Sequence, residues 1–102
     1  MPLSSFVTTD PATMLAAAED LASIGAAMSA ANSGAAGPTA GVVPAAADQV
    51  SALTATQFAR HADQYRAAST AAAAVHSLLV STLHANAMSY ELTEAANAVA
   101  AG

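Results

Sequence analysis

The chain is 102 residues long, which is enough for one domain. Hydrophobic residues make up 55% of the sequence, but much of that share is alanine, and only 9% of the residues are charged. The net charge is −5, and Arg60 and Arg66 are the only basic residues, which argues against nucleic acid and anionic lipid headgroups as partners because both require several cationic side chains.

The first ten residues contain no basic residue and no long apolar run, so they lack the features of a Sec-type signal peptide. We therefore expect the chain to be cytosolic, or to leave the cell by a route that reads no N-terminal signal. Asp10, or Thr9, suits the cap of a first helix. Pro11 suits the first helical position, because the N–H that proline lacks needs no partner there.

The first helix is expected from about residue 11 to about residue 33. Met14, Leu21 and Met28 recur at seven-residue spacing. The residues three positions after each of them are Ala17, Ile24 and Ala31. This heptad pattern predicts a helix face that packs against another helix. Gly25 costs up to about 1 kcal/mol relative to alanine within a helix, so we expect it to permit the close approach of a neighbouring helix.

An irregular loop is expected over about residues 34–46, because three glycines and two prolines between Gly34 and Pro44 disfavour a regular helix. The second helix is expected from about residue 47 to about residue 98. Asp48 then lies in its first turn, where a carboxylate suits the positive end of the helix dipole. Residues 1–102 are thus predicted to form one all-α domain, an antiparallel two-helix hairpin that completes a helical bundle with a partner protein.

The second helix carries two stripes at helical spacing. One stripe is Thr54, Phe58, His61, Tyr65, Ala68, Ala72, Val75, Leu79 and Thr82, and the other is His76, Val80, Leu83, Ala87 and Tyr90. The shorter first helix can cover only part of this surface, and alanine adds little apolar area to a core. We therefore expect a partner protein to complete the fold. The residues expected to form the core and the partner-binding surface are Met14, Leu21, Ile24, Met28, Leu53, Phe58, Tyr65, Val75, Leu79 and Leu83.

No constellation of side chains indicates an enzyme, a metal site or a cofactor. The chain has no cysteine, and His76 and His84 are not at the four-residue spacing typical of a zinc pair. No acidic residue lies between Asp63 and Glu91. Glu91 and Glu94 lie together on the expected helix surface, which is typical of a solvated face. We expect no catalytic residue, no bound metal and no cofactor.

A membrane-active or pore-associated helix is the alternative interpretation. Residues 67–90 contain no Asp, Glu, Lys or Arg, and the stretch is long enough to span a bilayer of about 30 Å. It also contains His76, His84 and Asn86, and its bulk is alanine, which is too weakly apolar to offset these polar side chains. The heterodimer interpretation is therefore favoured over the membrane interpretation.

Three motifs together resemble the PE proteins of mycobacteria, and the resemblance covers the whole chain. Residues 5–7, Ser-Phe-Val, followed by Pro11, are similar to the opening of the family, although Ala12 stands where the Pro-Glu signature has glutamate. Residues 38–51 are similar to the family's Val-Val-Pro-Pro-Ala-Ala-Asp-x-Val-Ser stretch, with Ala45 in place of the second proline. Tyr90 and Glu94 match the Tyr-x-x-x-Asp/Glu signal of type VII secretion.

The resemblance is to a short member that consists of the PE domain alone, and it implies a fold of two antiparallel helices. It implies an obligate heterodimer with a PPE protein, whose PPE subunit is held by an EspG-type chaperone. The dimer would be assembled in the cytoplasm and exported by the ESX secretion machinery to the medium or the cell surface. Tyr90 and Glu94 are then the expected secretion signal, needed for export but not for pairing.

Overall fold

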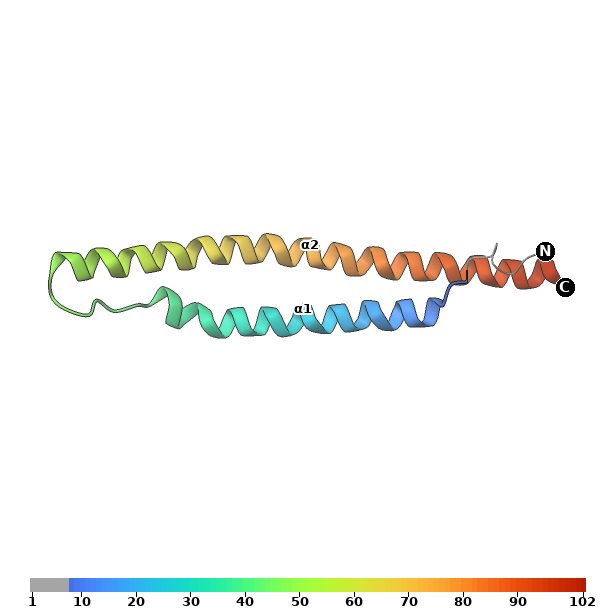
Figure 1. Cartoon of the computed structure of the whole chain (residues 1–102), viewed down its shortest axis with the longest axis horizontal. Helices are drawn as coiled ribbons and strands as arrows, with labels where there is room; N and C mark the ends of the chain where they lie inside the picture. Colours follow the sequence, from blue (N-terminus) through green and yellow to red (C-terminus); the bar gives the residue numbers. More distant parts are fainter. Residues whose placement is uncertain (1–7) are drawn as a thin grey trace. The chain divides into compact units, whose positions relative to one another are not determined.

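The computed structural model describes residues 8–102, and this part of the chain forms two helices (Figure 1). α1 extends over Pro11–Ala40 and α2 over Gln49–Ala101, and residues 41–48 connect them. The helices run in opposite directions, so the predicted all-α hairpin is confirmed. The Ser-Phe-Val motif at residues 5–7 lies outside the described residues.

Each helix begins after an aspartate cap that is followed three residues later by a hydroxyl side chain. Asp10 precedes α1, where its Oδ1 accepts the backbone N–H of Thr13 (3.2 Å) and its Oδ2 accepts the Thr13 hydroxyl (2.8 Å). Asp48 precedes α2 and accepts the backbone N–H (2.8 Å) and the hydroxyl (3.1 Å) of Ser51. Pro11 takes the first position of α1, as predicted. Asp48 caps α2 from outside, whereas the sequence placed it in the first turn.

α1 continues beyond its predicted end near residue 33 and passes through two glycines and Pro38 to Ala40. Proline disrupts a helix because it lacks an N–H and crowds the carbonyl four residues earlier. At Pro38 this disruption affects only the last turn of α1. The hydroxyl of Thr39 donates to the carbonyl of Ala35 (2.7 Å), one turn earlier in the same helix. The loop between the helices is therefore shorter than the predicted 34–46.

Contacts divide the chain into two units, and each unit contains parts of both helices. The first unit combines the chain up to Ser23 with Ser77–Gly102. The second unit comprises Ile24–His76 and includes the loop. That residues 1–102 form a single domain therefore stays a prediction.

The helices of the first unit pack through alanines flanked by larger apolar residues. Ala18 of α1 and Ala87 of α2 are buried, with exposed fractions of 1% and 0%. Half-buried apolar side chains beside them are Met14, Leu15, Leu21, Val80 and Leu83. Because alanine is small, the two helix backbones can approach closely at this position.

The helices of the second unit meet through small and polar residues. The half-buried positions are Gly25, Asn32, Ala36, Ala40, Ser51, Ala55, Ala59, Ala62, Ser69 and His76. A Cβ added at Gly25 would lie 2.7 Å from Cδ2 and from Nε2 of His76, so the close approach predicted at this glycine is to the His76 ring. The Tyr65 hydroxyl donates to Oδ1 of Asn32 (2.8 Å), which joins the two helices by a hydrogen bond. No side chain within residues 24–76 is fully buried.

Candidate partner-binding surface

The ten residues predicted for the core and the partner surface fall into two groups. Met14, Leu21 and Leu83 are half-buried between the helices of the first unit. The other residues are exposed by 52–68%: Ile24, Met28, Leu53, Phe58, Tyr65, Val75 and Leu79. The exposed group is available to a partner, and it does not supply a core within this chain.

The face of α1 that meets α2 differs from the predicted heptad face. Met14 and Leu21 are half-buried, but Met28 is exposed, and the residues predicted three positions later differ as well. The sequence placed Ala17 and Ile24 in the seam, but both are exposed. Ala18 and Gly25, one residue later in each case, lie against α2 instead. Small side chains at these two positions permit a closer approach of the helix backbones than the branched side chain of Ile24 would allow. α1 therefore turns its small face inward and leaves Ile24 at the surface.

α2 has one covered stripe and one exposed stripe, as its sequence pattern predicted. In the covered stripe, His76, Val80 and Leu83 are half-buried and Ala87 is buried, while Tyr90 is exposed. Every residue of the other stripe is exposed, from Thr54 to Thr82. α1 is the only other helix of residues 8–102, so it covers just one of the two apolar faces of α2.

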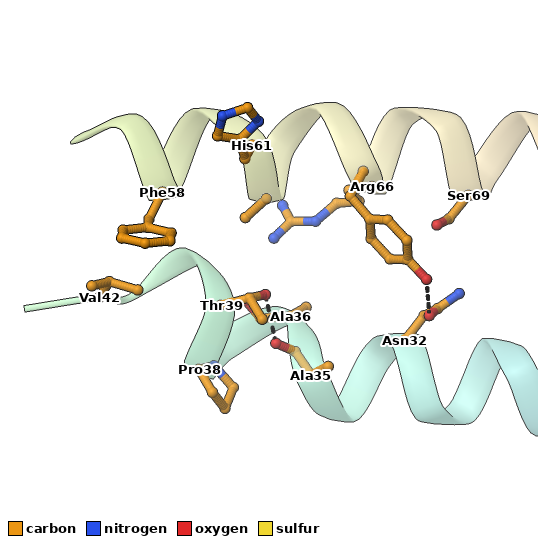
Figure 2. A pocket seen from close by; sticks show the side chains of 12 residues that line it. Asn32, Ala35, Ala36, Pro38, Thr39, Val42, Phe58, His61, Arg66 and Ser69 are labelled. Carbon is orange, nitrogen blue, oxygen red and sulfur yellow. Dashed lines mark hydrogen bonds between the residues drawn. The ribbon is translucent and has the colours of Figure 1, made fainter. Parts of the chain in front are cut away.

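The second unit contains a groove of about 420 Å³, which we call the loop-end groove. Its walls include Phe58, Tyr65 and Arg66 from α2, Asn32 from α1, and Val42 from the loop. Figure 2 shows Val42 and Phe58 together at one end, beside the last turn of α1, and the hydrogen bond of Asn32 at the other end. The sequence singled out Phe58 and Tyr65 but gave no signal for Arg66 or Asn32, because the groove depends on how α1 ends.

Three threonine hydroxyls on α2 are satisfied by their own helix. The side chains of Thr54, Thr56 and Thr70 each donate to the carbonyl four residues earlier, at 2.9, 3.0 and 2.9 Å respectively. A threonine bonded in this way has no remaining hydroxyl proton to donate. The α2 surface can therefore be covered by an apolar partner without leaving these donors unsatisfied.

Tyr90 and Glu94, the predicted secretion signal, lie one helical turn apart near the end of α2. Tyr90 is 44% exposed and Glu94 is exposed. Thr9, which precedes α1, donates its hydroxyl to Oε1 of Glu94 (3.1 Å). Sequence reasoning missed this contact, because it joins residues from opposite ends of the chain within the first unit.

The three histidines are dispersed, and the part of the chain that the structure describes holds no group of three or more His, Cys, Asp or Glu arranged to bind a metal ion. His61 lines the loop-end groove, and His76 packs on Gly25. His84 is exposed on α2. These placements give His76 a packing role that the sequence did not indicate.

The uncharged stretch 67–90 lies within α2. Among residues 8–102, neither helix combines the length and the apolar character needed to cross a membrane.

The sequence of this chain is similar to those of a known protein family. The sequence profile of the PE family matches residues 7–97. The chain is 56% identical over 97 residues to the PE family protein PE13 of Mycobacterium tuberculosis, an alignment that covers 95% of this chain and 98% of PE13. It is 45% identical to PE8 of the same organism and 49% identical to the PE-PGRS protein PE_PGRS34, but it spans only 35% and 19% of their respective lengths.

Proposed function

Since this chain belongs to the PE family, we propose that it is a non-enzymatic interaction protein, which forms an obligate heterodimer with a PPE protein and is exported by a type VII (ESX) secretion system. One observation carries the pairing: within residues 8–102 the buried residues are two alanines, Ala18 and Ala87, while large apolar side chains stay exposed. Full burial of one such side chain is worth about 1.5–3 kcal/mol. A helical partner that covers these side chains would supply the stabilisation that the hairpin lacks.

Both helices of the second unit contribute to the surface proposed for the partner. Ile24 and Met28 project from α1, and Phe58 and Tyr65 project from α2, with exposed fractions between 54% and 60%. Large side chains at helical spacing are the typical means by which one helix packs into the grooves of another. In this proposal the EspG-type chaperone binds the PPE subunit, so no surface of this chain is assigned to the chaperone.

The pairing is tested by substituting Phe58 in the complex co-expressed with a PPE protein. Phe58→Ala removes an aromatic wall of the loop-end groove and should weaken the complex by about 2 kcal/mol or more, because large aromatic side chains dominate protein interfaces. Val99→Ala, at a site that is 83% exposed near the end of α2, is the matched control and should change affinity little. An unchanged dissociation constant for Phe58→Ala would remove Phe58 from the interface.

Export is tested at the other end of α2. Tyr90→Ala and Glu94→Ala should abolish secretion of the heterodimer but leave its assembly in the cytoplasm intact, because both side chains are exposed and follow the buried Ala87 towards the end of α2. Secretion is measured by immunoblotting of culture filtrate and cell pellet, and assembly by co-purification from the cells. Normal secretion of both variants, or loss of the PPE partner from either, would contradict the assignment.

A further inference from the structure

The loop-end groove combines apolar walls with a single cation. Val42, Phe58 and Tyr65 form apolar parts of the wall, with exposed fractions of 40%, 55% and 60%. Arg66 lines the same groove, and Figure 2 shows its guanidinium in the space between the helices. Arg60, the other basic residue of the chain, is not part of the groove wall. The two arginines therefore have different surroundings although they lie on the same helix.

Arg66 has no ionic partner of its own. All seven carboxylates of the chain lie within residues 8–102, and none of them forms an ion pair with the Arg66 guanidinium in this part of the chain. Its nearest acidic residue in sequence is Asp63 on the same helix. In an acidic chain with two basic residues, this leaves a positive charge that lies beside an apolar surface and is solvated by water instead of being paired with a carboxylate.

The openness of the groove indicates what kind of molecule would cover it. Sites for small ligands typically enclose 70–90% of the ligand surface. Val42, Phe58 and Tyr65 in the walls of the loop-end groove keep 40–60% of their surface exposed, so an occupant as large as a helix can reach them. A helix of a partner protein can cover the whole groove, and this chain already requires such a partner under the function proposed above.

Covering the groove changes the energetics of Arg66. An exposed guanidinium is solvated by water, but a buried charge without a partner is strongly unfavourable. A carboxylate is the group that best matches a guanidinium, because it can accept two parallel hydrogen bonds. An occupant that covers Phe58, Val42 and the exposed Arg66 side chain together is therefore favoured when it presents an anion to the guanidinium.

We propose that the loop-end groove is the docking site for a helix of the PPE partner that carries a large apolar side chain and, one or two helical turns away, a carboxylate that pairs with Arg66. The apolar side chain lies against Phe58 and Val42, and the carboxylate accepts from the guanidinium. This inference rests on the proposed PPE pairing, and it adds the chemistry of the partner's contact residues. It makes Arg66 a determinant of which PPE proteins bind.

The experiment compares the two arginines in the full complex with a PPE protein that binds the unmodified chain. Arg66→Glu should raise the dissociation constant by about tenfold or more, because it places a like charge opposite the partner's carboxylate. Arg60→Glu is the matched control with the same charge change on the same helix, and it should raise the constant by less than about threefold. Arg66→Met keeps the apolar stem of the side chain and should show an intermediate loss. Dilution of fluorescently labelled complexes gives the constants, and far-UV circular dichroism checks that helix content is unchanged.

The outcomes separate this inference from the function it rests on. If the unmodified chain pairs with a PPE protein but Arg66→Glu and Arg60→Glu weaken the complex equally, the docking inference is wrong and the pairing stands. If the unmodified chain forms no complex with any PPE protein, the proposed function itself fails. Native mass spectrometry of the complex provides a further check: a bound amphiphile that is lost in Arg66→Glu, with partner affinity unchanged, would show that the groove serves a small molecule and overturn the inference.

Discussion

At Gly25 the absence of a side chain decides how closely α1 approaches α2. A Cβ at this position would lie 2.7 Å from two atoms of the His76 ring, a distance that real Cβ atoms do not show. Gly34 lies in the same helix, and a Cβ there would meet nothing within 4 Å. The two glycines therefore share a helix but differ in function, since only Gly25 serves packing.

Gly25→Ala and Gly34→Ala should change stability in opposite directions. Alanine is favoured over glycine in a helix by up to about 1 kcal/mol, and Gly34→Ala should gain most of that amount. Gly25→Ala gains the same propensity, but overpacking against His76 costs about 1–3 kcal/mol, so the net result is a loss of about 1 kcal/mol. Thermal unfolding of the heterodimer measures both changes. A stabilising Gly25→Ala would show that the His76 ring moves aside without cost, and the double variant Gly25→Ala/His76→Ala should recover part of the loss.

At the scale of the helices, the two aspartate caps define where each helix begins. Hydrogen bonds from the Ser51 backbone N–H and then its hydroxyl lower the pKa of Asp48 below its ordinary value. The Thr13 hydroxyl and then its backbone N–H lower the pKa of Asp10 in the same way. In both cases the hydrogen bonds at the start of the helix favour the charged form of the carboxylate. Stability from these caps is therefore present above the unfolded pKa and is lost as pH falls through the lower folded pKa.

Asp48→Ala should loosen the first turn of α2 at neutral pH. In acid the variant and the unmodified chain should behave alike. At pH 7 the Ser51 amide should exchange with solvent faster in the variant than in the unmodified chain, because its acceptor is gone. As pH falls through the lowered pKa of Asp48, the carboxylate of the unmodified chain becomes protonated, so the two proteins should converge. Asp63→Ala, within α2 and away from its ends, is the control and should leave the Ser51 amide unaffected. Hydrogen exchange measured by NMR across this pH range tests the prediction, and a difference that persists at low pH would contradict it.

The end of α1 shows why the boundary between helix and loop was misplaced. Glycine and proline disfavour a helix on average, and on that basis the sequence predicted a loop from about residue 34. Pro38 is nevertheless tolerated in the last turn, where a lost N–H affects one hydrogen bond only. The continued helix contributes Thr39 and Pro38 to the walls of the loop-end groove, which Phe58 also lines.

At the scale of the whole molecule, the exposed apolar side chains imply that stability depends on a partner. A partner that binds only the folded chain stabilises it by about 2.7 kcal/mol when its free concentration is one hundred times the dissociation constant. Helices that contact each other mostly through small residues gain little stability from packing against one another. Most of the stability of the folded hairpin must therefore come from the partner.

The isolated chain should therefore be much less stable than the same chain in its complex. Circular dichroism should show lower helicity and a lower unfolding temperature for the chain alone, and size exclusion should show a one-to-one complex after co-expression with a PPE protein. The unfolding temperature of the complex should also rise with protein concentration. A stable helical monomer or homo-oligomer without a PPE protein would contradict this prediction and would favour self-assembly or membrane association.

The sequence by itself determined the all-α hairpin, the start of α1 at Pro11 and the presence of two apolar stripes on α2, because caps and helical periodicity are local properties. It also identified Phe58 and Tyr65 as surface candidates, which the structure leaves exposed. Only the tertiary structure decided which stripe faces α1, that Ala18 and Gly25 rather than Ala17 and Ile24 form the seam, and that Arg66 lines a groove. Adjacent faces of an alanine-rich helix have nearly the same hydrophobicity, so the choice between them depends on which small residues let the two backbones come closest.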